Sequence, residues 1–126
     1  MSALAIATQQ LLLQPVIVGQ AILAAQTVAI SSTVLLPLAA PGLYRLTYVL
    51  VVTGTGTSTL TANAIYTDAA KAETIAVLSA VSVTATGTFQ SSIVVENIAA
   101  ANISYSVTLG GASAVWNLYI TAERLF

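Results

Sequence analysis

The chain has 126 residues, which suits one domain, and it carries three basic and four acidic residues for a formal net charge of −1. It has no histidine and no cysteine, which excludes disulfides, zinc–thiolate sites and thiol nucleophiles and, with them, most enzyme chemistry. Three basic residues form no positive patch for nucleic acid, and soluble monomers carry about 25% charged residues, so we expect much of this surface to lie against something other than water.

The first 26 residues contain no charge and are expected to form an N-terminal arm, either extended or as a short helix. Residues 2–14 fit a helix capped by Ser2, whereas residues 15–19 favour extended structure. An apolar arm is costly to leave in water, so we expect it to pack on a neighbouring subunit or a larger scaffold. The residues expected to make this contact are Leu11, Leu12, Leu13, Val16 and Ile17.

Residues 21–40 are about as long as a membrane-spanning helix. Polar residues such as Gln26 and Ser31 interrupt the segment, Pro37 follows, and no flanking Lys or Arg would anchor it, so it does not predict a span. The first ten residues carry no positive charge ahead of the apolar run, which argues against a secretory signal. We therefore expect a chain made inside the cell and left unprocessed.

Alternation of side chains is clearest in residues 43–52, and both faces of this predicted strand are substantially apolar. Gly54 and Gly56 then predict a turn, and residues 59–67 alternate again, so a hairpin is expected. Residues 68–73 hold half of the acidic residues and the only lysine, which predicts an exposed loop.

The remaining segments with strand character are residues 27–36, 74–86 (one or two strands), 88–96, 102–109 and 115–125. Seven or eight short strands with turn signals about every ten residues predict an all-β fold, an antiparallel β-sandwich of the jelly-roll kind. The expected division is an arm over residues 1–26 and a sandwich domain over residues 27–126.

The positions of the charged residues predict how two of the strands align with each other. If residues 43–52 pair antiparallel with the last strand, Arg45 approaches Glu123 and Arg124 is left for a different partner. An exposed ion pair of this kind contributes no more than about 1 kcal/mol, so it would help to fix the register.

We find no catalytic motif. Asp68, Glu73, Glu96 and Glu123 are spread along the chain, and isolated acids are most often solvated charges. The Gly54-Thr55-Gly56 segment lacks the lysine and helix of a phosphate loop, and the serines and threonines have no histidine to act as base. We therefore expect a protein that is not an enzyme, with no catalytic, cofactor or metal site.

The aromatic residues fall mostly within predicted strands, where rings with polar tips fit a core edge or a subunit interface. They are Tyr44, Tyr48, Tyr66, Tyr105, Trp116 and Tyr119. A glycan site would need more polar donors and acceptors than the chain offers. Asn63, Asn97, Asn102 and Asn117 are candidates for polar contacts.

Four short segments carry a resemblance to a known family: Gly42-Leu43-Tyr44-Arg45 at the start of a strand, Ala64-Ile65-Tyr66-Thr67-Asp68, Ile103-Ser104-Tyr105-Ser106-Val107, and Leu118-Tyr119-Ile120 followed by Glu123-Arg124-Leu125. Over residues 27–126 the chain resembles small β-rich structural proteins encoded in the morphogenesis regions of tailed bacteriophages. The long apolar N-terminus and the very low charge depart from that pattern.

The resemblance implies a jelly-roll decoration or cement protein that sits on the capsid, commonly as a trimer at local three-fold positions. Its implied partners are copies of itself, as a homotrimer, and the major capsid protein or another virion scaffold, with neither nucleic acid nor a membrane. The implied location is the virion, assembled in the host cytoplasm. Besides the five arm residues, the candidate interface or structural residues are Tyr44, Arg45, Tyr66, Tyr105, Trp116, Tyr119 and Glu123.

Two other functions compete with this interpretation. A receptor-binding sandwich of a tail or fibre would show exposed aromatic and polar side chains at one loop end. A membrane-active β protein, which ranks lower, would show long strands with an apolar outer face and aromatic girdles, and the girdles are not evident in the sequence.

Overall fold

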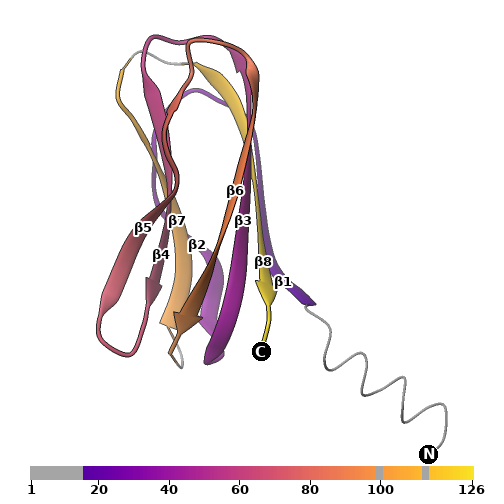
Figure 1. Cartoon of the computed structure of the whole chain (residues 1–126), viewed down its shortest axis with the longest axis vertical. Coiled ribbons are helices and arrows are strands. Elements are labelled where there is room, and N and C mark those ends of the chain that lie inside the picture. Colours follow the sequence, from indigo (N-terminus) through magenta and orange to yellow (C-terminus); the bar gives the residue numbers. More distant parts are fainter. Residues whose placement is uncertain (1–15, 99–100, 112–113) are drawn as a thin grey trace, which may run out of the picture.

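The computed structural model describes residues 16–98, 101–111 and 114–126, and the regular elements in them are β-strands (Figure 1). The strands of this described part are β1 (Val16–Gln26), β2 (Ile30–Ala39), β3 (Gly42–Gly54), β4 (Thr59–Thr67), β5 (Ala72–Ser82), β6 (Gly87–Asn97), β7 (Ala101–Leu109) and β8 (Val115–Arg124). None of the described residues lies in a helix, so none of them provides a helix that is long and apolar enough to cross a membrane.

The strands form two four-stranded sheets that face each other. The order is β1-β8-β3-β6 in the first sheet and β2-β7-β4-β5 in the second, and every pairing is antiparallel. Among the described strands, each connection crosses from one sheet to the other except the β4–β5 turn. This is the jelly-roll arrangement, and the predicted all-β antiparallel sandwich is confirmed.

Alternation along the central strands builds the core between the sheets. The largest side chains that are fully buried there include Trp116, Tyr44, Tyr48, Leu46, Leu50, Leu118 and Ile120 from the first sheet and Leu60, Ile103 and Val107 from the second. The Tyr48 hydroxyl reaches across the core and donates to the backbone carbonyl of Asn63 at 3.0 Å. Burial, followed by the neighbouring Tyr105, raises the pKa of Tyr48 well above its usual range. This phenol therefore stays a hydrogen-bond donor far into the alkaline range.

The predicted hairpin between residues 43–52 and 59–67 is wrong, although both segments are strands. β3 lies in the first sheet between β8 and β6, and β4 lies in the second sheet between β7 and β5. A glycine-rich turn suits a crossing between sheets as well as a hairpin. Long-range pairing decides between them, because β6 and β8 take both edges of β3.

The boundary expected at residue 27 also shifts, because the sandwich already begins at Val16. β1 pairs with β8, so residues 16–26, which we assigned to the arm, belong to the first sheet. Two register shifts interrupt β1 and break the alternation that marks a strand in the sequence. The rest of the predicted arm, residues 1–15 with the three leucines, lies outside the described residues.

The strand expected at residues 27–36 begins three residues later, and β2 continues past Pro37. A strand at the edge of a sheet tolerates proline because one row of its N–H groups needs no partner. β2 is such an edge strand, which explains why Pro37 does not end it.

Candidate assembly surface

All seven charged side chains lie at one end of the sandwich, where β1 and β3 begin and β8 ends (bottom of Figure 1). In the first sheet, Arg45 of β3 stands opposite Glu123 of β8, which confirms the predicted register. Glu96 stands near the end of β6, opposite Leu43.

The second sheet adds the charges of the β4–β5 turn and of the start of β5. The backbone N–H of Ile98 donates to the carbonyl of Thr67 at 3.0 Å and ties the end of β6 to the end of β4. The charges of both sheets therefore share one end, which we call the charged end. Its charged residues are Arg45, Asp68, Lys71, Glu73, Glu96, Glu123 and Arg124.

Side chains of the charged end bond to the backbone of its loops. The Asp68 carboxylate accepts hydrogen bonds from the N–H groups of Ala70 at 2.8 Å and Lys71 at 3.0 Å. These bonds, the one from Lys71 foremost, hold the pKa of Asp68 below its usual range. Arg124 donates to the carbonyl of Pro41 at 3.1 Å, so it takes a partner of its own, as predicted.

The opposite end carries no charged residue and is called the uncharged end; it comprises residues 27–29, 55–58, 83–86 and 110–111. Its turns are joined by backbone bonds: Gly56 donates to Val83 at 2.8 Å, and Val83 donates to Ser58 at 3.0 Å. Gly111 packs so closely on Ser58 that a Cβ built on it would lie 2.5 Å from the Ser58 Cβ. Backbone bonds and close packing at glycine therefore fix this end.

Between the two ends, the outward positions of both sheets are mostly neutral. Two adjacent rows cross the first sheet: Ile22, Tyr119, Val49 and Gln90, and then Gln20, Thr121, Thr47 and Ser92. The outward positions of the central strands of the second sheet include Thr61, Asn63, Ile65, Asn102, Ser106 and Thr108. Neutral groups cost less than charges to remove from water, so these faces suit burial against protein.

Three of the predicted aromatic candidates lie in the core, where they stabilise the sandwich. Tyr44, Tyr105 and Trp116 are 1%, 5% and 0% exposed. The Tyr44 hydroxyl donates to the carbonyl of Ala40. Because Tyr48 is buried as well, these four rings form no exposed cluster at a loop end of the kind that a glycan site needs.

The other described candidates in the first sheet lie at its surface. Val16 and Ile17 are 54% and 60% exposed, and Tyr119 is 37% exposed. The register places Ile17, Glu123 and Arg45 in one row across β1, β8 and β3. The structure therefore brings part of the predicted set together at the charged end.

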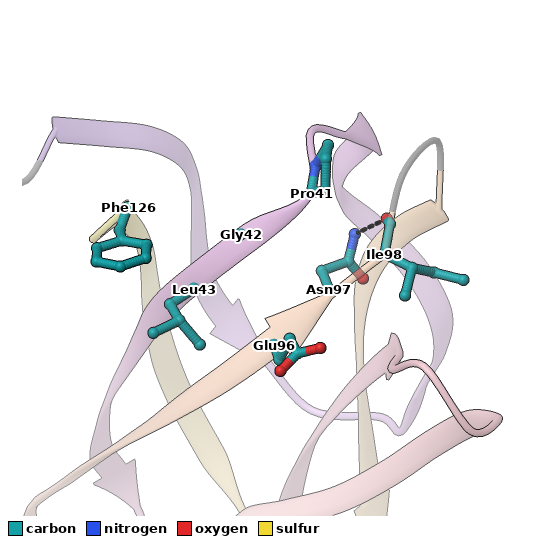
Figure 2. Close-up of a pocket in the computed structure, with 7 residues that line it drawn as sticks. All are labelled: Pro41, Gly42, Leu43, Glu96, Asn97, Ile98 and Phe126. Atoms are coloured by element: carbon teal, nitrogen blue, oxygen red, sulfur yellow. Dashed lines mark hydrogen bonds between the residues drawn. The ribbon is translucent and has the colours of Figure 1, made fainter.

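The charged end contains a pocket of about 620 Å³ that was not predicted from the sequence (Figure 2). It is lined by Pro41, Gly42, Leu43, Glu96, Asn97, Ile98 and Phe126. Gly42 has a φ of 154°, and a Cβ there would clash with the carbonyl oxygen of Phe126. The backbone N–H of Leu43 donates to that same carbonyl at 3.0 Å. These residues stand where strands begin and end, so no alternation pattern marks them.

Asn97 is fully buried beside this pocket and holds the backbone of two loops. Its Oδ1 accepts a hydrogen bond from the N–H of Thr67 at 3.4 Å. Its Nδ2 donates to the carbonyls of Ile98 at 2.9 Å and Ala101 at 3.1 Å, and Figure 2 shows the bond to Ile98. The prediction of polar contacts for this asparagine is confirmed.

A second pocket, of about 290 Å³, lies beside β6, and its lining residues are Tyr66, Asp68, Ala69, Ala70, Val94, Val95 and Glu96. Burial, followed by the Glu73 and Asp68 carboxylates, raises the pKa of Tyr66, a predicted interface residue that is half-buried here. In the described part of the chain, no three carboxylates gather in a way that could hold a metal ion.

Of the four edge strands that the structure describes, three contain a bulge with a non-glycine residue at positive φ: Ala25 in β1 (51°), Leu38 in β2 (45°) and Ala80 in β5 (47°). A side chain of the neighbouring strand accepts a hydrogen bond from each of their N–H groups: Asn117 Oδ1 at 2.7 Å, Asn102 Oδ1 at 2.8 Å and Thr61 Oγ1 at 3.0 Å. The fourth edge strand, β6, pairs with β3 in unbroken register.

A scan against models of protein families finds no match, and a search of curated proteins finds no similar sequence. Solved structures share the fold. The PRD1 vertex protein P5 matches with a TM-score of 0.54 and 17% identity, over 88% of this chain and 99% of that one. The VP2 subviral particle of infectious bursal disease virus matches with a TM-score of 0.52 and 15% identity, over 88% of this chain and 32% of that one. At these identities the likeness shows the fold alone, a jelly roll shared with viral proteins.

Proposed function

We propose that the chain is a structural protein of a virion, without enzymatic activity, that binds the capsid shell and stabilises it as a decoration or cement protein. The gathering of all seven charges at one end carries this proposal. It leaves the two sheet faces and the uncharged end neutral, so they are the surface to bury against the shell, while the charged groups face water. The fold shared with the vertex protein P5 and with VP2 supports the proposal.

A cement protein works through binding energy, because it adds buried area across the seams between capsid subunits. A seam contact of about 1,000 Å² would contribute on the order of 10 kcal/mol or more of apolar burial before entropic costs. Contacts between neutral surfaces are screened little by salt. Such binding would therefore persist over a wide range of ionic strength.

In this proposal the chain acts as a homotrimer bound to the major capsid protein or another virion scaffold. Light scattering of the purified protein in detergent-free buffer tests the trimer, since three chains of 12.8 kDa give about 38 kDa. A monomer, or an aggregate that only detergent resolves, would contradict it.

The virion role is tested with virus particles purified with and without the chain. We expect mass spectrometry to detect the chain in the complete particles, and we expect particles that lack it to assemble but to release their genome at a lower temperature. Absence of the chain from purified particles would overturn the proposal.

A pair of lysine substitutions tests which surface binds the shell. Thr108→Lys places a charge on the neutral second sheet, and Ala72→Lys places one at the start of β5 in the charged end; both positions are exposed. Because burying an unpaired charge is costly, we expect Thr108→Lys to weaken binding to shells that lack the chain by at least about tenfold. Ala72→Lys should bind like the wild type, and equal effects would contradict the assignment of the surfaces.

A further inference from the structure

The free edge of β6 is open for a further strand. Within the described part of the chain β6 pairs with β3 alone, so its outer edge presents unpaired backbone N–H and C=O groups. Bulges at Ala25, Leu38 and Ala80 interrupt the other three edges and hinder such pairing. β6 runs for 11 residues, with no proline and with Glu96 as its single charge. A regular edge of this kind binds an extended peptide through main-chain hydrogen bonds.

The smaller pocket lies along the second half of β6 and is bordered by Val94 and Glu96. The side chains of Val94 and of Ile98, just beyond the end of β6, are 54% and 38% exposed. A strand added to this edge would therefore find apolar cover for alternate side chains, in addition to backbone partners.

We propose that the N-terminal segment of a second copy of this chain, residues 1–15, adds as a strand to the free edge of β6. Its leucine triplet, Leu11, Leu12 and Leu13, covers the exposed apolar side chains of Val94 and Ile98. The segment contains no charged residue, so its burial removes no charge of its own from water.

The length of the chain before β1 assigns the segment to a second copy. Leu11, the member of the triplet farthest from β1, lies five residues before Val16, which gives it a reach of about 17 Å. β1 and β6 are opposite edges of the first sheet, so a strand added outside β6 lies four strand spacings, or about 19 Å, from β1. The leucine triplet therefore does not reach β6 of its own chain, whereas β6 of an adjacent copy is accessible to it.

The donor segment and the acceptor edge are different surfaces of one chain, so the contact is heterologous. Such contacts close into rings when the rotation between copies allows it. Three copies that each donate one segment would form a closed trimer. The contact joins copies of this chain and does not depend on the identity of the shell protein.

Cysteine crosslinking tests the contact without background, because the chain contains no cysteine. Full-length copies with Leu12→Cys and with Val94→Cys are coexpressed under different affinity tags and treated with a mild oxidant. The matched control replaces Val94→Cys by Val34→Cys, since Val34 is 48% exposed and lies on the bulged edge strand β2. Mass spectrometry of the peptides identifies which positions are joined.

We expect the interchain crosslink between positions 12 and 94 at a yield at least fivefold above that of the control pair. Equal yields, or a monomeric protein, would overturn the proposal. A double variant that crosslinks positions 12 and 94 within one chain would overturn the assignment to a second copy. If a cysteine variant does not fold, Val94→Lys and Val34→Lys give a second measurement. We expect light scattering to give a lower mass for Val94→Lys and an unchanged mass for Val34→Lys.

The virion role is tested separately from the segment exchange, whereas a monomeric protein would contradict both the exchange and the homotrimer of the proposed function. Failure of the crosslink with the chain still present in virions would reject the segment exchange alone. A crosslink in a chain that is absent from virions would support the exchange and reject the virion role.

Discussion

The charged end and the uncharged end close the same two sheets with different chemistry. At the charged end, side chains bond to the backbone: Asn97 holds Thr67 and Ala101, and Asp68 holds its own turn. At the uncharged end, backbone bonds join the turns, and Gly111 packs directly on the neighbouring loop. An end fixed through charged groups needs water around them, whereas an end fixed by glycine packing has no charge to desolvate.

The difference separates a surface suited to water from one suited to protein. Outside the charged end, the surface offers hydroxyl, amide and aliphatic groups that can be buried at low cost. The two ends therefore differ because all of the few charges lie at one of them. The net charge of −1 by itself does not indicate this difference. Four sets of variants would break or sharpen this comparison.

The largest expected effect concerns the core beneath the uncharged end. Trp116 is fully buried opposite Val52, and within the described part of the chain its Nε1 makes no hydrogen bond. We expect Trp116→Ala to lower the free energy of unfolding by about 3–5 kcal/mol. Trp116→Phe loses no hydrogen bond and should cost less than about 2 kcal/mol. Urea denaturation measures both, and a loss for Trp116→Phe as large as that for Trp116→Ala would contradict the expectation.

At the charged end, substitution of Asn97 tests how much the hydrogen bonds from side chains to the backbone stabilise the fold. Asn97→Ala leaves partly buried backbone groups of Thr67, Ile98 and Ala101 without their side-chain partner, and we expect a loss of about 3 kcal/mol. The control is Asn63→Ala, which removes the bond from Asn63 Nδ2 to Ser106 Oγ and should cost about 1 kcal/mol. Similar losses for both, by urea denaturation, would contradict a special role for Asn97.

Glycine packing at the uncharged end has its own pair of variants. Gly111→Ala places a Cβ 2.5 Å from that of Ser58, so we expect the free energy of unfolding to fall by about 1–3 kcal/mol. In Gly87→Ala the new Cβ meets the Phe89 ring at an ordinary 3.7 Å, and the change should stay within about 0.5 kcal/mol. Thermal unfolding compares the two, and a neutral Gly111→Ala would reject close packing as the cause.

The smallest expected effect is the pH dependence of the charged end. The folded pKa of Asp68 lies below its ordinary value of 3.8, so its carboxylate stabilises the fold above that value. This contribution is lost as pH falls through the folded pKa. Asp68→Asn keeps an acceptor oxygen but does not titrate. We expect the wild type to exceed Asp68→Asn in urea midpoint at neutral pH and to lose that advantage on acidification. A difference that is independent of pH would contradict the assignment.

Much of the strand content was predictable because alternation is a local property. Residues 59–67 alternate and form β4 with those bounds. The pairing of Arg45 with Glu123 also followed once β3 was assumed to lie beside β8. β1 was missed because its bulges break the alternation. The hydrogen bonds that Asn102 and Asn117 accept from two bulges connect residues far apart in the chain.

The sequence by itself determined the all-β class, the approximate strands, the scarcity of charge and the absence of histidine and cysteine, because each follows from composition or from neighbouring residues. Only the tertiary structure decided that β3 and β4 lie in different sheets, that the charges of both sheets share one end, and that β6 is the one regular edge among those described. These features depend on pairings between distant segments. The free energy of such pairings depends on the whole sheet, so it cannot be predicted from a local sequence pattern.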